Sequence, residues 1–212
     1  MISSAHLRLP APPILLVTDR SQAKGDLIAI VAAALKGGLR WVSVREKDLP
    51  EAEQAALVRA LRPIADAHGA CLTLHGSAAL AQAAGADGVH LSGGADPGAA
   101  RALLGPEALI GQSIHGIPEA AAADAAALDY LVAGPAFETA SKPGYGPALK
   151  EAGLRALRAA SPLPLIAIGG VGVAQMPICR KGGAAGVAVM GGLMRAADPD
   201  AEARALVAAW SG

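Results

Sequence analysis

The stretch that decides the fold is PLPLIAIGGVGVAQMPICRKGGAAGVAVMGGL, residues 162–193. Two short aliphatic runs, at 165–168 and 186–190, each end in a Gly-Gly pair, and a helical pattern at 174–181 separates them. A strand, a helix and a second strand in this order are typical of a parallel sheet with helical crossovers. The stretch therefore predicts one β-α-β unit.

The same alternation extends outward along the whole chain. The strands that we expect are Ile14–Thr18, Arg40–Arg45, Cys71–His75, Gly88–Leu91, Leu109–Ser113, Tyr130–Ala133, Leu165–Ile168 and Gly186–Met190. The helical patterns are 26–36, 51–68, 118–127, 149–159, 174–181 and 200–210, with shorter ones after the third and fourth strands. Eight such units predict an α/β fold, a single (β/α)8 TIM barrel that forms one domain over residues 1–212. The alternative is an open doubly wound sheet, which would normally carry fewer strands.

Composition and charge exclude several classes of protein. Lys and Arg number 18 and Asp and Glu number 18, so the chain lacks the basic excess of general nucleic-acid binders and electrostatic membrane binders. Hydrophobic residues make up 53%, too many for a disordered chain, yet no apolar run approaches the roughly 20 residues that span a bilayer. Cys71 and Cys179 match no metal spacing and indicate buried thiols in a reducing compartment. We expect a cytoplasmic protein with no nucleic-acid or membrane partner, and the sequence leaves open whether it forms a homo-oligomer.

Barrel geometry indicates where to look for a site. Active sites of such barrels form at the C-terminal ends of the strands, and alternate strand residues point into the lumen. Polar residues recur at period two late in the second to fifth strands: Ser43, Arg45 and Lys47; Cys71, Thr73 and His75; His90 and Ser92; Ser113 and His115. The sequence therefore predicts a polar site at the mouth of the barrel.

Glycine pairs end the seventh and eighth strands, at Gly169–Gly170 and Gly191–Gly192. Glycine lets backbone N–H groups approach an anion closely, and the loops after strands seven and eight are the usual phosphate site of this fold. We therefore expect a phosphate there. The alternative is that the glycines only supply tight turns.

Cations lie beside this expected anion site. Arg45 and Lys47 face the lumen, with Glu46 between them facing away, and cations in a mouth usually meet an anionic ligand or fixed acids. The alternative is an ordinary ion-pair cluster of these cations with Glu46, Asp48 or Asp19.

The loop after the sixth strand, residues 138–146, is polar and glycine-rich and is long enough to form a lid. Lys142 supplies a third candidate cation there, and Thr139 and Ser141 are further substrate-binding candidates. The alternative is a solvated loop whose lysine has no role.

Three histidines, His75, His90 and His115, share the lumen side. Zinc would need them to converge at short range with a carboxylate, and nothing in the sequence fixes that convergence. Imidazole can take and return a proton near neutral pH, so we expect acid–base work from at least one of them and no metal site.

Taken together, the strand ends resemble the thiamine phosphate synthase / TenI family. The matching stretches are LLVTD (15–19), GGLRWVSVREKDL (37–49), AGADGVHLS (84–92), IGQSIH (110–115), LDYLVAGPAFETASKPGYGP (128–147), PLIAIGGV (164–171) and GAAGVAVMGGL (183–193). The resemblance implies a (β/α)8 barrel with a thiazole phosphate whose phosphate group lies against Gly169–Gly170 and Met190–Gly192. In the synthases, an aminopyrimidine diphosphate is held by cations that match Arg45, Lys47 and Lys142, and by Mg²⁺.

Departures from the family pattern separate its two branches. Synthases typically carry Gln where this chain has Ser43, and Asn-Asp where it has His75-Gly76, so a metal-binding Asp is missing. A second metal-binding Asp matches Asp96 only with a one-residue insertion, and Asp96 before Pro97 is also typical of a helix N-cap. The tautomerase branch lacks these carboxylates and uses a histidine at the position of His115.

The resemblance therefore predicts a metal-independent thiazole tautomerase, an isomerase with His115 and His75 as catalytic candidates, a phosphorylated substrate and no cofactor. One alternative is a diverged thiamine phosphate synthase, a transferase that uses Mg²⁺. The other is a non-catalytic barrel that binds a phosphorylated ligand and regulates.

Overall fold

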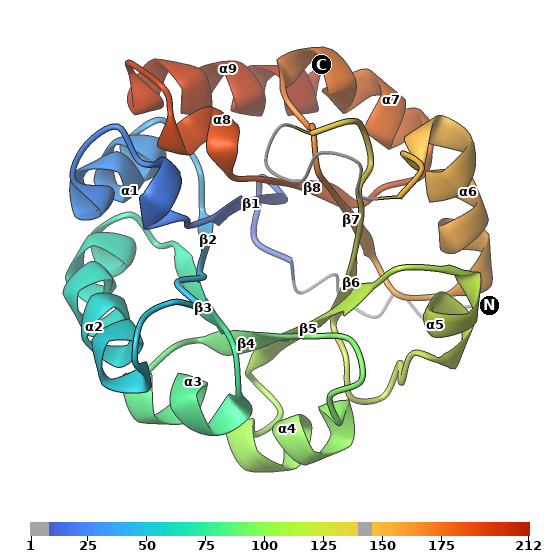
Figure 1. Cartoon of the computed structure of the whole chain (residues 1–212), viewed down its shortest axis with the longest axis horizontal. Coiled ribbons are helices and arrows are strands. Elements are labelled where there is room, and N and C mark those ends of the chain that lie inside the picture. The colour runs from blue at the N-terminus through green and yellow to red at the C-terminus, as the bar shows by residue number, and fades with distance from the viewer. Residues whose placement is uncertain (1–8, 140–145) are drawn as a thin grey trace.

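A closed barrel of eight parallel strands forms the centre of the molecule (Figure 1). The computed structural model describes residues 9–139 and 146–212. The strands are β1 Ile14–Val17, β2 Trp41–Val44, β3 Cys71–His75, β4 Gly88–Leu91, β5 Leu109–Ile114, β6 Tyr130–Ala133, β7 Leu165–Ile168 and β8 Gly186–Val189. Each strand pairs with the next in sequence order, and β1 closes the ring, with Leu15 opposite Trp41 of β2 and Ala188 of β8. This confirms the predicted (β/α)8 TIM barrel over the open doubly wound sheet.

Helices surround the barrel as an outer ring (Figure 1). They are α1 Leu27–Lys36, α2 Glu51–Ala67, α3 Ala78–Ala84, α4 Pro97–Leu104, α5 Ile117–Ala122, α6 Lys150–Ala160, α7 Met176–Lys181, α8 Gly191–Met194 and α9 Pro199–Ser211. Short 3-10 turns, η1 Arg20–Gln22 and η2 Val173–Gln175, precede α1 and α7. Within the described ranges, no helix has the length and apolar character needed to cross a membrane.

The helix after the fifth strand is shorter than the sequence predicts. We expected it over 118–127, but α5 ends at Ala122, and Ala123 has an extended backbone. The Asp124 carboxylate then accepts a hydrogen bond from the Ala126 backbone N–H at 2.9 Å, which stabilises a turn in place of further helix. The predicted helix is too long because the alanine-rich sequence favours a helix through residue 127. The Asp124 side chain favours a turn, and this local effect prevails.

The strands alternate between an outer core and a lumen core. On β1, Ile14 and Leu16 pack outward toward the helices, whereas Leu15 and Val17 point into the lumen. In the lumen, the rings of Trp41 and Tyr130 meet edge to face with centroids 4.8 Å apart, as expected for packing residues. Trp41 and Tyr130 belong to the same buried cluster as Leu15 and Val17.

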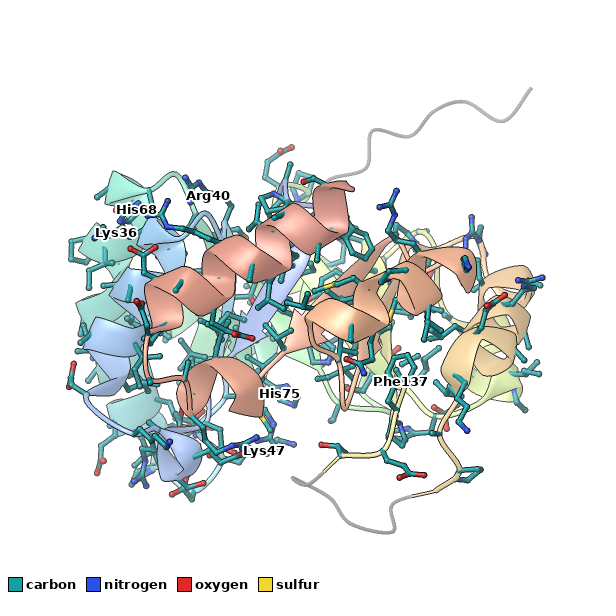
Figure 2. All side chains as sticks on the ribbon, turned by 90° about the horizontal axis from the view of Figure 1, so that it is seen from above. Lys36, Arg40, Lys47, His68, His75 and Phe137 are labelled. Atoms are coloured by element: carbon teal, nitrogen blue, oxygen red, sulfur yellow. The ribbon has the colours of Figure 1, made fainter. Side chains whose placement is uncertain are left out.

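The ends of the barrel carry different side chains. Lys47, His75 and Phe137 lie toward one end, whereas Lys36, Arg40 and His68 lie toward the other (Figure 2). The first end is the one to which the C-termini of the strands point, since Lys47 and His75 follow or end β2 and β3. We call this end the mouth and the opposite end the base.

Candidate active site at the mouth of the barrel

A cavity of about 520 Å³ opens at the mouth. Every predicted site residue that the structure describes lines it: His75, His115, Arg45, Lys47, Thr139, Gly169, Gly170, Met190, Gly191 and Gly192. The two remaining candidates, Ser141 and Lys142, lie outside the described residues. Side chains from most of the strand ends therefore converge on one chamber, as the fold predicts.

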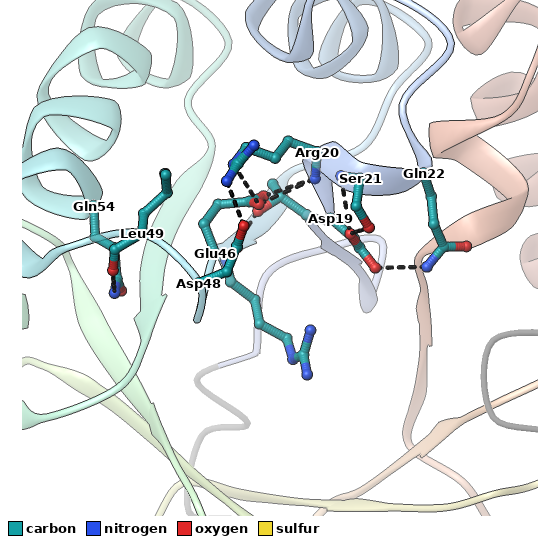
Figure 3. A network of polar contacts seen from close by, with 10 residues as sticks. Asp19, Arg20, Ser21, Gln22, Glu46, Asp48, Leu49 and Gln54 are labelled. Atoms are coloured by element: carbon teal, nitrogen blue, oxygen red, sulfur yellow. Dashed lines mark hydrogen bonds and ion pairs between the residues drawn. The ribbon is translucent and has the colours of Figure 1, made fainter.

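The cations at the end of β2 face the cavity, whereas the carboxylates next to them do not. Glu46 is 2% exposed, and its carboxylate accepts the Arg20 backbone N–H at 3.1 and 3.2 Å (Figure 3). The Arg20 guanidinium also forms an ion pair with Asp48. Glu46 and Asp48 therefore pair with Arg20. Of the alternative cluster of fixed acids, Asp19 remains, because the charge of Arg45 lowers the pKa of Asp19.

Asp19 organises the loop after β1. Its carboxylate caps η1 by accepting hydrogen bonds from the Ser21 backbone N–H at 3.1 Å and the Gln22 side-chain amide at 2.5 Å (Figure 3). Burial alone would raise the pKa of Asp19, but the hydrogen bonds from Ser21 and Gln22 and the charge of Arg45 lower it below its ordinary value. Asp19 is therefore a fixed anion that orients the Gln22 amide.

Gln22 in turn contacts Arg195, which the sequence analysis did not identify. The Arg195 guanidinium donates to the Gln22 side-chain oxygen and lines the cavity. Arg195 directly follows α8, and no motif marks it. The only available signal was its position four residues after Gly191, one helical turn beyond the strand end.

His90 forms a neutral polar group deep in the cavity. It is 4% exposed, its Nε2 lies 2.8 Å from Ser113 Oγ, and its Nδ1 has no partner among the described residues. Its ring lies 4.8 Å from that of His75 and stacks on Tyr130. Burial, with the positive charges of Lys47 and Arg45, lowers the pKa of His90 to about 3, so the imidazole is neutral at physiological pH.

His115 is placed differently from His90. Its side chain is 49% exposed, it lines the cavity, and its Nδ1 lies 3.3 Å from the Glu119 carboxylate. The same carboxylate accepts the His115 backbone N–H at 2.7 Å, which fixes the residue at the start of the β5–α5 loop. An exposed imidazole held by a carboxylate is suited to taking and returning a proton.

The two glycine pairs serve different local needs. Gly169 and Gly170 have φ angles of +97° and +64°, which glycine adopts without strain, and a Cβ atom on Gly170 would overlap the backbone carbonyl of Glu138. A Cβ atom on Gly191 would instead overlap the Arg195 guanidinium. A Cβ atom on Gly192 would meet nothing within 4 Å, so this position faces open space. Backbone contacts account for Gly170 before any ligand is considered, whereas a larger residue at 191 would displace only the ends of the Arg195 and Gln22 side chains.

The acidic residues near the mouth do not form a site that fits Mg²⁺. The Asp96 carboxylate accepts the Ala99 backbone N–H at 3.0 Å, so Asp96 is the N-cap of α4. Glu46 and Asp19 are engaged as described above, and β3 and β4 end in His75-Gly76 and Ser92-Gly93. Among the residues that the structure describes, no three His, Cys, Asp or Glu side chains lie together as metal ligands would. Among the described residues that line the cavity, Glu138 alone carries a carboxylate. Mg²⁺ takes several oxygen ligands, so one carboxylate offers too few without substrate phosphates.

Known proteins resemble this chain along most of its length. A family model described as thiamine monophosphate synthase matches residues 14–193. A putative thiamine-phosphate synthase of Geobacter sulfurreducens is 45% identical and covers 91% of this chain and 92% of its own length. A thiamine-phosphate synthase of Roseiflexus castenholzii is 36% identical over 91% of this chain and 86% of its own. Among solved structures, thiamine phosphate pyrophosphorylase from Pyrococcus furiosus superposes with a TM-score of 0.82 at 28% identity, covering 93% of this chain and 95% of that one.

Proposed function

The chain belongs to the thiamine monophosphate synthase family, and from that premise we propose that it couples an aminopyrimidine diphosphate to a thiazole phosphate in the mouth cavity. We also propose that residues 1–212 form one domain. The observation that carries the proposal is the convergence of Arg45, Lys47 and the glycine ends of β7 and β8 on one chamber. The names of the relatives favour this coupling, whereas the departures at Ser43 and His75-Gly76 favour tautomerisation.

The proposed reaction is a displacement at the methylene carbon of the pyrimidine. A C–N bond forms between the thiazole nitrogen and this carbon, and the C–O bond to the diphosphate breaks, so the diphosphate leaves with the electron pair. Negative charge develops on the leaving group, and fixed cations at that point lower the barrier. Arg45 and Lys47 line the cavity and are placed to meet this charge.

The thiazole phosphate is proposed to bind at the ends of β7 and β8. Substitutions at Gly170 or Gly191 would disturb the chain itself, because a Cβ atom there overlaps protein atoms. Gly192→Ala is a cleaner test, because the added methyl group meets nothing in the chain and enters open space. If the backbone at Gly192 approaches the phosphate, this variant should bind thiazole phosphate about tenfold or more weakly. Gly25→Ala, another exposed glycine with open space around it, is the matched control.

Tautomerisation of a carboxythiazole phosphate is the second candidate. The kinds of side chain that lie at the mouth favour it. β3 and β4 end without carboxylates, and His115 presents an exposed imidazole to the cavity. The reaction removes a proton from one atom of the ring and returns a proton to another, so it needs an anion site and an acid–base group. If it takes place, His115→Asn should lower its rate by about 10²–10⁴, the usual effect of losing such a group, with little change in ligand affinity. Near-normal turnover of the His115→Asn variant would exclude His115 as the acid–base group and leave His75 as the candidate.

One experiment separates the candidates. The purified chain is assayed for pyrimidine–thiazole coupling and for carboxythiazole tautomerisation, each with and without Mg²⁺. Formation of thiamine phosphate supports the coupling proposal, and tautomerisation alone replaces it with the second candidate. Binding of thiazole phosphate with neither activity would favour a regulatory barrel.

A further inference from the structure

Arg195 lines the mouth cavity, and its contacts differ from those of the arginines that pair with acids. Arg20, Arg62 and Arg101 each form an ion pair with a carboxylate. Within the described residues, Arg195 donates instead to the neutral amide oxygen of Gln22 and forms no ion pair. Its positive charge is therefore held in place without being neutralised by a fixed acid.

Hydrogen bonds between neighbouring side chains hold the Arg195 guanidinium at the cavity wall. The Asp19 carboxylate accepts from the Gln22 amide nitrogen at 2.5 Å, which turns the Gln22 oxygen toward Arg195. The Lys24 backbone N–H donates to the Met194 carbonyl at 3.0 Å, which fastens the loop after β1 to α8. Two contacts, Gln22 with Arg195 and Lys24 with Met194, thus link the loop after β1 to the segment after β8.

Gly191 provides the space that the guanidinium occupies. A Cβ atom at this position would lie 2.8 Å from Arg195 Nη2 and 2.7 Å from the Gln22 side-chain oxygen. Any larger residue at 191 would push Arg195 away from the strand end. The guanidinium therefore lies directly over the end of β8, where the thiazole phosphate is proposed to bind.

We propose that Arg195 binds the phosphate group of the substrate at the end of β8, and that Gln22 is a positioning residue for it. Gln22 engages Nη1, and the planar fork can present its remaining N–H groups to two phosphate oxygens. This inference rests on the proposed function, because it assigns the anion-binding side chain of that same site. It also divides the cations between the two substrates: Arg45 and Lys47 on β2 meet the diphosphate, and Arg195 beyond β8 meets the monophosphate.

Calorimetric titration tests the assignment with two probes, the hydroxyethylthiazole phosphate and the same thiazole without its phosphate. Arg195→Met keeps an unbranched apolar stem and removes the guanidinium with its charge. It should weaken binding of the phosphate ester about tenfold or more, and binding of the alcohol less than about twofold. Arg59→Met, the same change at an exposed arginine of α2 outside the cavity, should alter neither.

Gln22→Met tests the positioning role separately. It should weaken binding of the phosphate ester about threefold or more, and it should add nothing in the Arg195→Met background, because both changes remove the same interaction. Additive losses would assign Gln22 a role that does not pass through Arg195.

The outcomes keep the two proposals distinguishable. If Arg195→Met binds the phosphate ester as tightly as the unchanged chain, the inference is overturned and the proposed function stands. Equal losses for ester and alcohol would also overturn it, because Arg195 would then act on the shape of the cavity. If the unchanged chain does not prefer the ester to the alcohol, both proposals fall.

Discussion

Two arginines at the base of the barrel and the arginine beyond β8 at its mouth are held by different kinds of partner. At the base, Asp87 accepts the Leu72 backbone N–H at 2.6 Å and pairs with Arg62, and Asp129 accepts the Ile110 backbone N–H at 2.7 Å and pairs with Arg101. Each acid joins two strands, and each arginine is neutralised by it. At the mouth, Arg195 is held by an amide.

This difference shows which charges are structural and which face a ligand. Arg45 is partly buried, and a partly buried cation without a counter-ion carries a desolvation cost that an anionic ligand can offset. Arg195 is exposed, so its charge is open to an anion that enters the cavity. Arginines that pair with fixed acids, as at the base, stabilise the chain before anything binds. The comparison predicts that substitutions of the arginines that line the cavity lower activity and leave stability unchanged, whereas substitutions of the acid-paired arginines at the base do the reverse.

The largest effect is expected for Arg45 at the mouth. Arg45→Met removes a cation that is proposed to meet the leaving diphosphate, so kcat/KM for coupling should fall by about 10²–10³. The unfolding midpoint should change little, because no ion pair with a described carboxylate is lost. Steady-state coupling kinetics and urea unfolding measure the two quantities, with Arg59→Met as the control. A destabilised but fully active variant would place Arg45 with the structural cations.

The next effect concerns stability at the base. Arg101 donates to the Ala127 carbonyl at 3.2 Å and the Ala108 carbonyl at 2.7 Å, in addition to its ion pair with Asp129, which is 12% exposed. Arg101→Met leaves a half-buried carboxylate without its cation, so the free energy of unfolding should fall by about 3 kcal/mol. Activity per folded molecule should not change.

A surface ion pair provides the control for this measurement. Arg155 pairs with Glu151 on the exposed face of α6, and Arg155→Met should cost less than about 1 kcal/mol. Equal losses for Arg101→Met and Arg155→Met would contradict the structural role assigned to the base.

The sequence predicted the barrel closely because strand boundaries depend on local patterns. β3, β4, β6 and β7 have the predicted ends, and the lumen positions of Arg45, His75 and His115 follow from period two. Arg195 was missed because its position depends on Gln22, a contact between residues 173 apart in the chain. The partner of Glu46 was missed for the same reason, since Arg20 lies on a different loop. The local pattern of a strand predicts which face of the sheet a side chain lies on. Contacts between residues on different loops depend on the closure of the barrel, which no local pattern shows.

A smaller effect is expected from the buried histidine at the mouth. The pKa of His90 is lowered to about 3 by burial and by the charges of Lys47 and Arg45, whereas the unfolded chain has an ordinary histidine pKa near 6.5. Below pH 6.5 the unfolded state therefore binds a proton that the native state does not. Stability is fully present above this pH and is lost as the pH falls toward 3, by about 1.4 kcal/mol per pH unit.

His90→Gln isolates this contribution, because it keeps a polar group near Ser113 and removes the titration. Urea unfolding between pH 6.5 and pH 5 should give a shallower loss of stability for the variant than for the unchanged chain. Parallel pH profiles would show that His90 is protonated in the folded barrel.

The last prediction is that the free chain does not bind Mg²⁺ detectably. A hard dication would need several oxygen ligands. Asp96 is engaged as a helix cap and Glu46 is turned toward Arg20, which leaves Glu138 as the carboxylate among the described cavity-lining residues. Arg45 and Lys47, which line the same cavity, would repel a dication there. Calorimetric titration with Mg²⁺ at millimolar concentration should give only heat of dilution, and Mg²⁺ titrated into inorganic diphosphate confirms that the measurement detects binding. A saturable heat that disappears in Asp96→Asn would contradict this prediction. It would show that Asp96 holds a metal ion at the mouth, and that fixed carboxylates balance positive charge there as they do at the base.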